Sequence, residues 1–172
     1  LSWLEQSRQA FLRAGIEMDA AVADLYRAQC FLDVSLLPEA ADLVTKLLDS
    51  FAQLKMPRQV ARAALLLADV YSRRGEIDRA YQELERARRV FRVQGDGLEV
   101  ALVDIRRATL LREEGQPGTA LRLISEAIEA LDVDPYPLRH AEAHLMMAAC
   151  CEDLGRITEA QYSAAQQLAE EK

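Results

Sequence analysis

The stretch that decides the fold is residues 63–96, AALLLADVYSRRGEIDRAYQELERARRVFRVQGD. Its apolar residues recur at spacings of three and four, first up to Tyr71 and then from Ala80 to Phe91. This spacing is the period of one face of a helix. Gly75 lies between the two patterns and can adopt the left-handed conformation that ends a helix. The stretch therefore predicts two helices joined by a short turn.

The same pattern recurs along the chain with a fixed period of 40. The glycines that end the first helix of each repeat are evenly spaced at this period, at Gly75, Gly115 and Gly155. Chance predicts about 0.03 all-alanine columns in an alignment of the chain with itself at this period. Two helices approach to about 8 Å only where their side chains are small, so such a column predicts a recurring helix crossing. Three such columns occur: Ala21/Ala61/Ala101/Ala141, Ala28/Ala68/Ala108/Ala148 and Ala40/Ala80/Ala120/Ala160.

The period divides the whole chain into repeats. We expect residues 1–172 to form a single helical repeat domain, because each hairpin can bury its apolar stripe only against a neighbour. Residues 1–15 match the second helix of a truncated repeat. The fold class expected is all-α, a right-handed α-solenoid of antiparallel helical hairpins with about nine helices. The complete repeats expected are 17–56, 57–96, 97–136 and 137–172.

Composition excludes several classes of protein. Only 6% of the residues are aromatic, and Gly and Pro are few, which argues against a β-sandwich or barrel. The net charge of −7 argues against nucleic acid as the main partner. No apolar run approaches the roughly 20 residues that a membrane span needs. Three cysteines form no disulfide framework, which favours a reducing compartment, the cytoplasm.

The repeat resembles the tetratricopeptide repeat (TPR). The residues that carry the resemblance in the second complete repeat are Leu67, Ala68, Tyr71, Gly75, Ala80, Leu84 and Ala87. Two features depart from the family. The period is 40 rather than about 34, so the helices or the turns must be longer. The family's tryptophan position is taken by Asp24, Ala64, Asp104 and His144.

The resemblance implies a function and a binding surface. In the TPR family one side of each first helix lines a concave groove that holds peptides or partner helices. The chain is therefore expected to be a non-catalytic scaffold that binds a protein, a peptide or a neighbouring domain, without a cofactor. The groove residues implied are Tyr26, Gln29, Asp33, Arg62, Leu66, Asp69, Arg73, Arg106, Thr109 and Glu113.

The long period also resembles the TPR arrays of bacterial signalling proteins and those next to CHAT protease domains. The alternative function implied is a regulatory or sensor arm of a CHAT-type, caspase-like protease or of a signalling regulator. Its catalytic residues would then lie outside this chain.

Two side-chain groups offer alternatives to a simple scaffold. One group could hold zinc or support thiol chemistry; it consists of His140, His144, Cys150 and Cys151. The preferred interpretation is structural, with the cysteines acting as small hydrophobic residues on a packed helix, because the sequence offers no further pair of ligands. The arginines at 86, 88, 89 and 92 could face an acidic partner. The competing interpretation is a solvated face whose charges are paired with Glu83 and Glu85.

The N-terminal end carries apolar residues that would need cover. Trp3, Leu4 and Phe11 belong to the stripe of the second helix of a repeat whose first helix does not precede them in this sequence. The sequence thus predicts an exposed apolar end or self-association through it.

Overall fold

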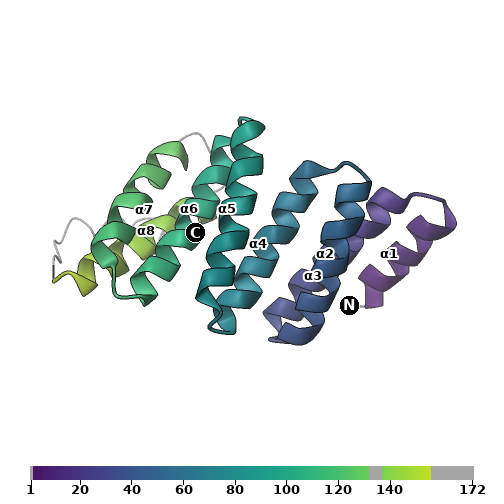
Figure 1. Ribbon diagram of the computed structural model, residues 1–172, viewed down its shortest axis with the longest axis horizontal. Helices are drawn as coiled ribbons and strands as arrows, with labels where there is room; N and C mark the ends of the chain where they lie inside the picture. The colour runs from purple at the N-terminus through teal and green to yellow at the C-terminus, as the bar shows by residue number, and fades with distance from the viewer. Residues whose placement is uncertain (1, 132–136, 156–172) are drawn as a thin grey trace. The chain divides into compact units, whose positions relative to one another are not determined.

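The computed structural model describes residues 2–131 and 137–155, and over these ranges its regular secondary structure is all helical (Figure 1). The helices, in chain order, are α1 (Ser2–Arg13), α2 (Glu17–Asp33), α3 (Leu37–Gln53), α4 (Pro57–Arg73), α5 (Ile77–Val93), α6 (Gly97–Glu113), α7 (Pro117–Leu131) and α8 (Pro137–Asp153). The all-α prediction is confirmed, and eight described helices compare with about nine expected. The ninth falls on residues 156–172, which lie outside the described part of the chain.

A regular spacing of helices produces the long repeat. The helices from α2 to α8 begin at evenly spaced positions, which are 17, 37, 57, 77, 97, 117 and 137, and a short turn precedes each one wherever the turn is described. All of these helices have 17 residues, except that α7 is described over 15, up to Leu131. One repeat is therefore two helix–turn units of nearly equal length, so both helices account for the long period.

The turns after α1, α2, α3, α4 and α6 have the hydrogen bonds of a Schellman motif. After α4, the N–H of Gly75 donates to the carbonyl of Ser72 at 2.9 Å and the N–H of Glu76 donates to the carbonyl of Tyr71 at 2.9 Å. The central residue of the motif has positive φ, 75° at Gly75. The same position after α2 and α3 holds Ser35 and Lys55, with φ of 60° and 56°. The turn geometry is thus kept even where glycine is missing.

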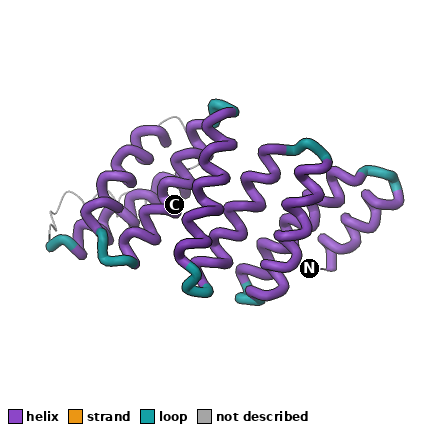
Figure 2. The backbone as a smooth tube through the Cα atoms, viewed as in Figure 1, coloured by secondary structure: helices purple, strands orange, loops and turns teal. Residues whose placement is uncertain are grey.

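The chain forms two compact units, residues 1–91 and 92–172. In the first unit, successive helices from α1 to α4 pack side by side (Figure 2). Helix α2 also touches α4. At the turn between α4 and α5, the guanidinium of Arg79 lies 4.8 Å from the centre of the Tyr71 ring. This cation–π contact holds the start of α5 against the end of α4.

In the second unit, α7 lies between α6 and α8. Ala120 and Ile124 of α7 share one apolar cluster with Ala108 of α6 and Cys150 of α8. A second cluster joins the end of α7 to both neighbours, through Ala101, Ala127, Leu131 and Ala143. Three column alanines of this unit, Ala101, Ala108 and Ala120, therefore lie in buried clusters between helices, as the sequence predicts. On α8 the prediction is wrong by two residues, because Ala141 and Ala148 are only half-buried and Ala143 and Cys150 are buried instead.

Candidate functional site

The groove residues predicted on the first unit lie on α2 and α4, which contact each other. On α2, Tyr26, Gln29 and Asp33 are exposed, at the i, i+3, i+7 spacing of one helix face. Tyr26 is the most prominent of them, with 55% of its surface exposed. On α4, Arg73 is exposed, whereas Arg62 and Asp69 are half-buried.

Leu66 does not belong to an accessible surface. It is only 6% exposed and lies in a run of buried residues from Ala63 to Ala68. Six consecutive residues span more than one helical turn, so the middle of α4 is buried on every side. Leu66 is therefore a packing residue, and we remove it from the candidate surface.

Arg73 joins α4 to α2, which are the first helices of two successive repeats. Its Nη1 donates a hydrogen bond of 2.8 Å to the main-chain carbonyl of Leu32, close to the end of α2. On α2 itself, Nε2 of Gln29 donates to Oδ1 of Asp33 at 2.8 Å. The candidate surface of this unit is thus a polar patch beside an exposed tyrosine, fixed at one end by an α4–α2 hydrogen bond.

The predicted groove residues of the second unit lie on α6. Glu113 is exposed, while Arg106 and Thr109 are half-buried. The hydroxyl of Thr109 donates to the carbonyl of Ile105 at 3.2 Å, so part of its hydrogen-bonding capacity is used within its own helix. Next to Glu113, the guanidinium of Arg112 binds both carboxylate oxygens of Asp153 on α8, at 2.6 and 3.3 Å.

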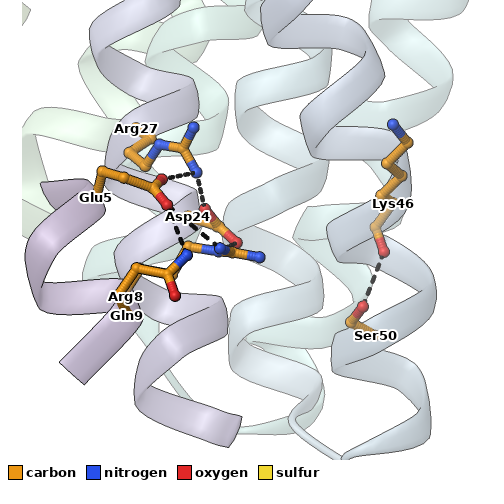
Figure 3. A network of polar contacts seen from close by, with 7 residues as sticks. All are labelled: Glu5, Arg8, Gln9, Asp24, Arg27, Lys46 and Ser50. Atoms are coloured by element: carbon orange, nitrogen blue, oxygen red, sulfur yellow. Dashed lines mark hydrogen bonds and ion pairs between the residues drawn. The ribbon is translucent and has the colours of Figure 1, made fainter. Parts of the chain in front are cut away.

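A partly buried ionic cluster joins α1 to α2 (Figure 3). Nε of Arg8 donates to Oδ2 of Asp24 at 2.7 Å, and Nη1 of Arg27 lies 3.0 Å from Oε2 of Glu5 and 2.5 Å from Oδ1 of Asp24. Nε2 of Gln9 donates to Oε1 of Glu5 at 2.9 Å. The hydrogen bond from Gln9, followed by the charges of Arg27 and Arg8, lowers the pKa of Glu5. The hydrogen bond to Asp24 raises the pKa of Arg8.

Our sequence reasoning missed this cluster. The signal was present, because Glu5–Arg8 and Asp24–Arg27 are both opposite charges at i, i+3 on predicted helices. The same four residue types recur two repeats later as Glu85, Arg88, Asp104 and Arg107. Within α6, Nη1 of Arg107 lies 3.4 Å from Oδ1 of Asp104, which repeats the Asp24–Arg27 pair.

The His/Cys group has the features of a packed helix. Cys150 and Cys151 are both buried, and burial raises the pKa of the Cys150 thiol, which disfavours the reactive thiolate. Among residues 2–131 and 137–155, no group of three or more His, Cys, Asp or Glu side chains could hold a metal ion. The geometry offers no support for zinc or thiol chemistry here.

Two of the arginines of α5 have acidic neighbours on the same helix. Arg86 Nη1 lies 3.6 Å from Glu83 Oε2, and Arg89 Nε lies 3.5 Å from Glu85 Oε1. These pairs favour the solvated, charge-paired face over a binding site for an acidic partner.

Two cavities of the first unit lie away from the candidate surface. One, of about 270 Å³, is lined by α1, α2 and α3, with Arg8, Asp24 and Leu47 among its residues. The other, of about 200 Å³, is mainly apolar and is bordered by Phe51, Met56 and Val90. Neither includes a predicted groove residue.

Comparison with solved structures identifies the type of repeat. BtubC (BKLC) from P. vanneervenii superposes with a TM-score of 0.75 over 88% of this chain, at 16% sequence identity. A putative kinesin light chain from Podosopora anserina, with nearly identical TPR-like repeats, superposes with a TM-score of 0.63 over 99% of this chain, at 12% identity. The fold is TPR-like. A variant of the same kinesin light chain gives a TM-score of 0.65 at the same identity and coverage.

The likeness concerns the fold alone, because identity is so low. This chain spans 63% of the BtubC chain and 93% of the kinesin light chain structure. No protein-family model matches the sequence, and no curated protein matches it. Among the described residues, no helix is both long enough and apolar enough to cross a membrane.

Proposed function

We propose that this chain is a non-catalytic protein-interaction scaffold of the long, 40-residue TPR type, which binds a partner segment along its first helices. The observation that carries the proposal is Tyr26. A tyrosine exposed over 55% of its surface stands on the same face of α2 as two hydrogen-bonding side chains. Tyrosine is enriched at the centre of protein interfaces, because it combines a large apolar ring with a polar tip.

The partner surface proposed on the first unit consists of Tyr26, Gln29 and Asp33 on α2, with Arg62, Asp69 and Arg73 on α4. It offers an apolar anchor, amide and carboxylate groups and basic side chains. Such a mixture suits an extended peptide or a partner helix that carries one apolar anchor and polar groups on either side. On the second unit, Arg106, Thr109 and Glu113 are the corresponding proposed residues on α6.

The three cysteines, Cys30, Cys150 and Cys151, are all free thiols. This supports the proposed location in a reducing compartment, the cytoplasm. The resemblance to bacterial arrays leaves one second candidate, the regulatory arm of a CHAT-type protease. A His and a Cys on an α/β domain in the same gene product would favour that candidate, and their absence would exclude it.

The proposed scaffold function is tested by measuring how much of a partner protein each variant of the chain recovers from cells. The tagged chain is used to purify partners from cells, and recovery of the most abundant specific partner is then compared between variants. Tyr26→Ala should lower recovery by about tenfold, since interface tyrosines commonly contribute about 1–2 kcal/mol or more. Val93→Ser, which changes an exposed apolar residue at the end of the second helix α5, is the matched control and should leave recovery unchanged. Equal recovery with both variants would place the interface elsewhere.

A further inference from the structure

An apolar crevice opens among the helices α3, α4 and α5. Its volume is about 200 Å³. Phe51, which is fully buried, lies beneath it, and the half-buried side chains of Met56, Val60 and Val90 border it. These residues belong to the end of α3, the turn that follows, the start of α4 and the last turns of α5, all within the first unit. The crevice is therefore formed by three consecutive helices of one unit.

The size of the crevice limits what it can hold. Pockets for small-molecule ligands usually enclose about 300–1,000 Å³ and use several polar groups to orient the ligand. This crevice is smaller, and among the described residues that line it the only charged one is Lys55. Met56 is flexible enough to adjust to different apolar groups. The crevice therefore suits one apolar side chain of a partner protein better than a whole metabolite or cofactor.

The rim of the crevice is basic. The side chain of Lys55 is exposed and forms no ion pair with a carboxylate of the described residues, whereas Lys46 is paired within its own helix. Residues 50–68 contain no Asp or Glu, and the positive charge continues into α4 at Arg58 and Arg62. An apolar crevice with a basic rim is complementary to an apolar side chain that has carboxylates beside it.

Lys55 also occupies a turn position that disfavours lysine. Its φ is 56°, in the left-handed region, whereas the equivalent turns after α1, α4, α5, α6 and α8 have glycine there. Residues with a Cβ that are held in this conformation cost stability and cluster at functional sites. A charge needed at the rim of the crevice accounts for a lysine at this position.

The cavity one repeat earlier shows that the fold alone does not make the crevice apolar. That cavity lies among α1, α2 and α3, and Asp24 is one of its lining residues. Glu17 and Ser50 line it at the positions that Pro57 and Val90 occupy here, 40 residues later. The repeat thus provides a crevice, and the residues around α4 give this one its chemistry.

We propose that the crevice docks an acidic segment of a partner protein, which inserts one leucine-sized apolar side chain between Met56, Val60 and Val90. A carboxylate next to that side chain is held by Lys55. None of the residues that line the crevice belongs to the surface proposed around Tyr26. The site is therefore an additional one, and its test does not depend on the partner of the first helices.

The probe for the test is the synthetic peptide GDDLDDG, acetylated and amidated, which presents one leucine between carboxylates. The full 172-residue chain is titrated with it by isothermal titration calorimetry, which needs no apolar dye. We expect saturable binding at one site per chain. Replacing the leucine of the peptide with serine should weaken binding by about tenfold or more, because burial of the leucine is lost. Replacing all four aspartates with asparagine should weaken it as well, because the ammonium of Lys55 then has no carboxylate to bind.

Carbodiimide crosslinking shows where the peptide binds. The reagent joins a carboxylate to a primary amine, and apart from its terminal amine the chain has only three, at Lys46, Lys55 and Lys172. We expect the peptide to be joined to Lys55 and the serine peptide to give little product. Equal labelling of Lys46 and Lys55 would show a general attraction to positive charge and would overturn the proposal.

Two charge-reversal variants are matched in net charge. Lys55→Glu should weaken binding of the peptide by about tenfold, because it places a like charge at the rim of the crevice. Lys46→Glu changes an exposed lysine that does not line the crevice and should change binding by less than about twofold. Equal loss with both variants, or no saturable binding by the unmodified chain, overturns the proposal.

Two glycine variants separate binding from stability. Lys55→Gly removes the charge and also relieves the left-handed backbone, so the variant should be more stable and yet bind the peptide less tightly. Ser35→Gly relieves the same conformation in the turn after α2 and should bind like the unmodified chain. Unchanged binding by Lys55→Gly overturns the proposal. So does sedimentation that shows a dimer of the unmodified chain which Lys55→Glu dissociates, because a second copy would then occupy the crevice.

Discussion

Arg73 of α4 donates a hydrogen bond of 2.8 Å to the main-chain carbonyl of Leu32 near the end of α2, and so joins the first helices of two repeats through residues that are 41 apart in sequence. A family resemblance alone would assign Arg73 to a partner. The geometry gives it a structural role as well, because its guanidinium is a second, charged donor to a carbonyl that also accepts from the N–H of Ser35 at 3.0 Å. Variants of Arg73 must therefore be interpreted for stability before they are interpreted for binding.

Arg73→Gln should lower the free energy of unfolding by about 0.5–1 kcal/mol, less than is usual for a bond to a charged donor because the side chain is exposed. Chemical denaturation of both proteins measures this difference. Arg92→Gln, an exposed arginine in the last turn of α5, is the control and should change stability by less. Equal effects would show that the bond to Leu32 does not hold the two helices together.

The turns provide a second prediction. Ser35 and Lys55 adopt positive φ, which costs a residue with a Cβ roughly 1 kcal/mol relative to glycine. No neighbouring atom lies within 4 Å of a Cβ added to Gly75, so the conformation alone decides the cost there. We expect Lys55→Gly to raise the free energy of unfolding by about 0.5–1 kcal/mol and Gly75→Ala to lower it by about 1 kcal/mol.

The control for the turn glycines is Gly118→Ala. Gly118 lies in the first turn of α7, without positive φ and with open space around it, so alanine should be neutral or stabilising there. Thermal unfolding of the three variants makes the comparison. If Gly75→Ala and Gly118→Ala had the same effect, the left-handed turn would not be the cause.

The alanine columns provide a third prediction. Ala108 is fully buried in the cluster that contains Ala120 and Ile124. Ala108→Leu should force α6 and α7 apart and lower the free energy of unfolding by about 1–3 kcal/mol. Ala130→Leu, at an exposed position of α7, adds the same side chain without a crossing to disturb and should have little effect. Denaturant titration of the two variants distinguishes a crossing from general helix propensity, and an Ala108→Leu chain as stable as the wild type would refute the crossing.

The ionic cluster between α1 and α2 predicts a dependence on pH. The hydrogen bond from Gln9 and the charges of Arg27 and Arg8 lower the pKa of Glu5, so the folded chain favours its ionised form. The stabilisation is present above the pKa of an unfolded glutamate, about 4.3, and is lost as the pH falls through the lower folded value. The difference in Tm between wild type and Glu5→Gln should therefore be largest near neutral pH and shrink on acidification.

Thermal unfolding from pH 7 down to about 3 tests this prediction. Glu129→Gln changes an exposed carboxylate of α7 and serves as the control, with little expected change in Tm at any pH. A difference for Glu5→Gln that stayed constant across this range would show that the carboxylate is not coupled to the docking of α1.

Much of this fold was predictable from the sequence, for a physical reason. Residues at helix crossings must be small in every repeat, so Ala28, Ala68 and Ala108 reveal the period without a structure. Gly75 and Gly115 likewise mark turns that require positive φ. The recurring alanines and glycines therefore fix where each helix and each turn falls in the sequence.

Other features depend on tertiary position, which the repeat pattern does not contain. Lys55 adopts the same turn as Gly75, but nothing in its type signals positive φ. Leu66 occupies a predicted groove position and is buried, because the middle of α4, from Ala63 to Ala68, is covered on every side. Arg73 reaches a main-chain carbonyl, an acceptor that has no sequence signature. A groove that is predicted from equivalent positions of the repeats therefore describes a real surface only once the burial and the partners of each residue are known.

The central claim is that a partner binds over the exposed face of α2, and photo-crosslinking from position 26 tests it most directly. A photoreactive phenylalanine analogue replaces Tyr26 in one chain and Val93 in another, and each chain is irradiated in cells. We predict that a partner protein is covalently captured from position 26 and is absent or much weaker from position 93. Capture of the same partner with equal yield from position 93, or no capture from position 26, would contradict the account.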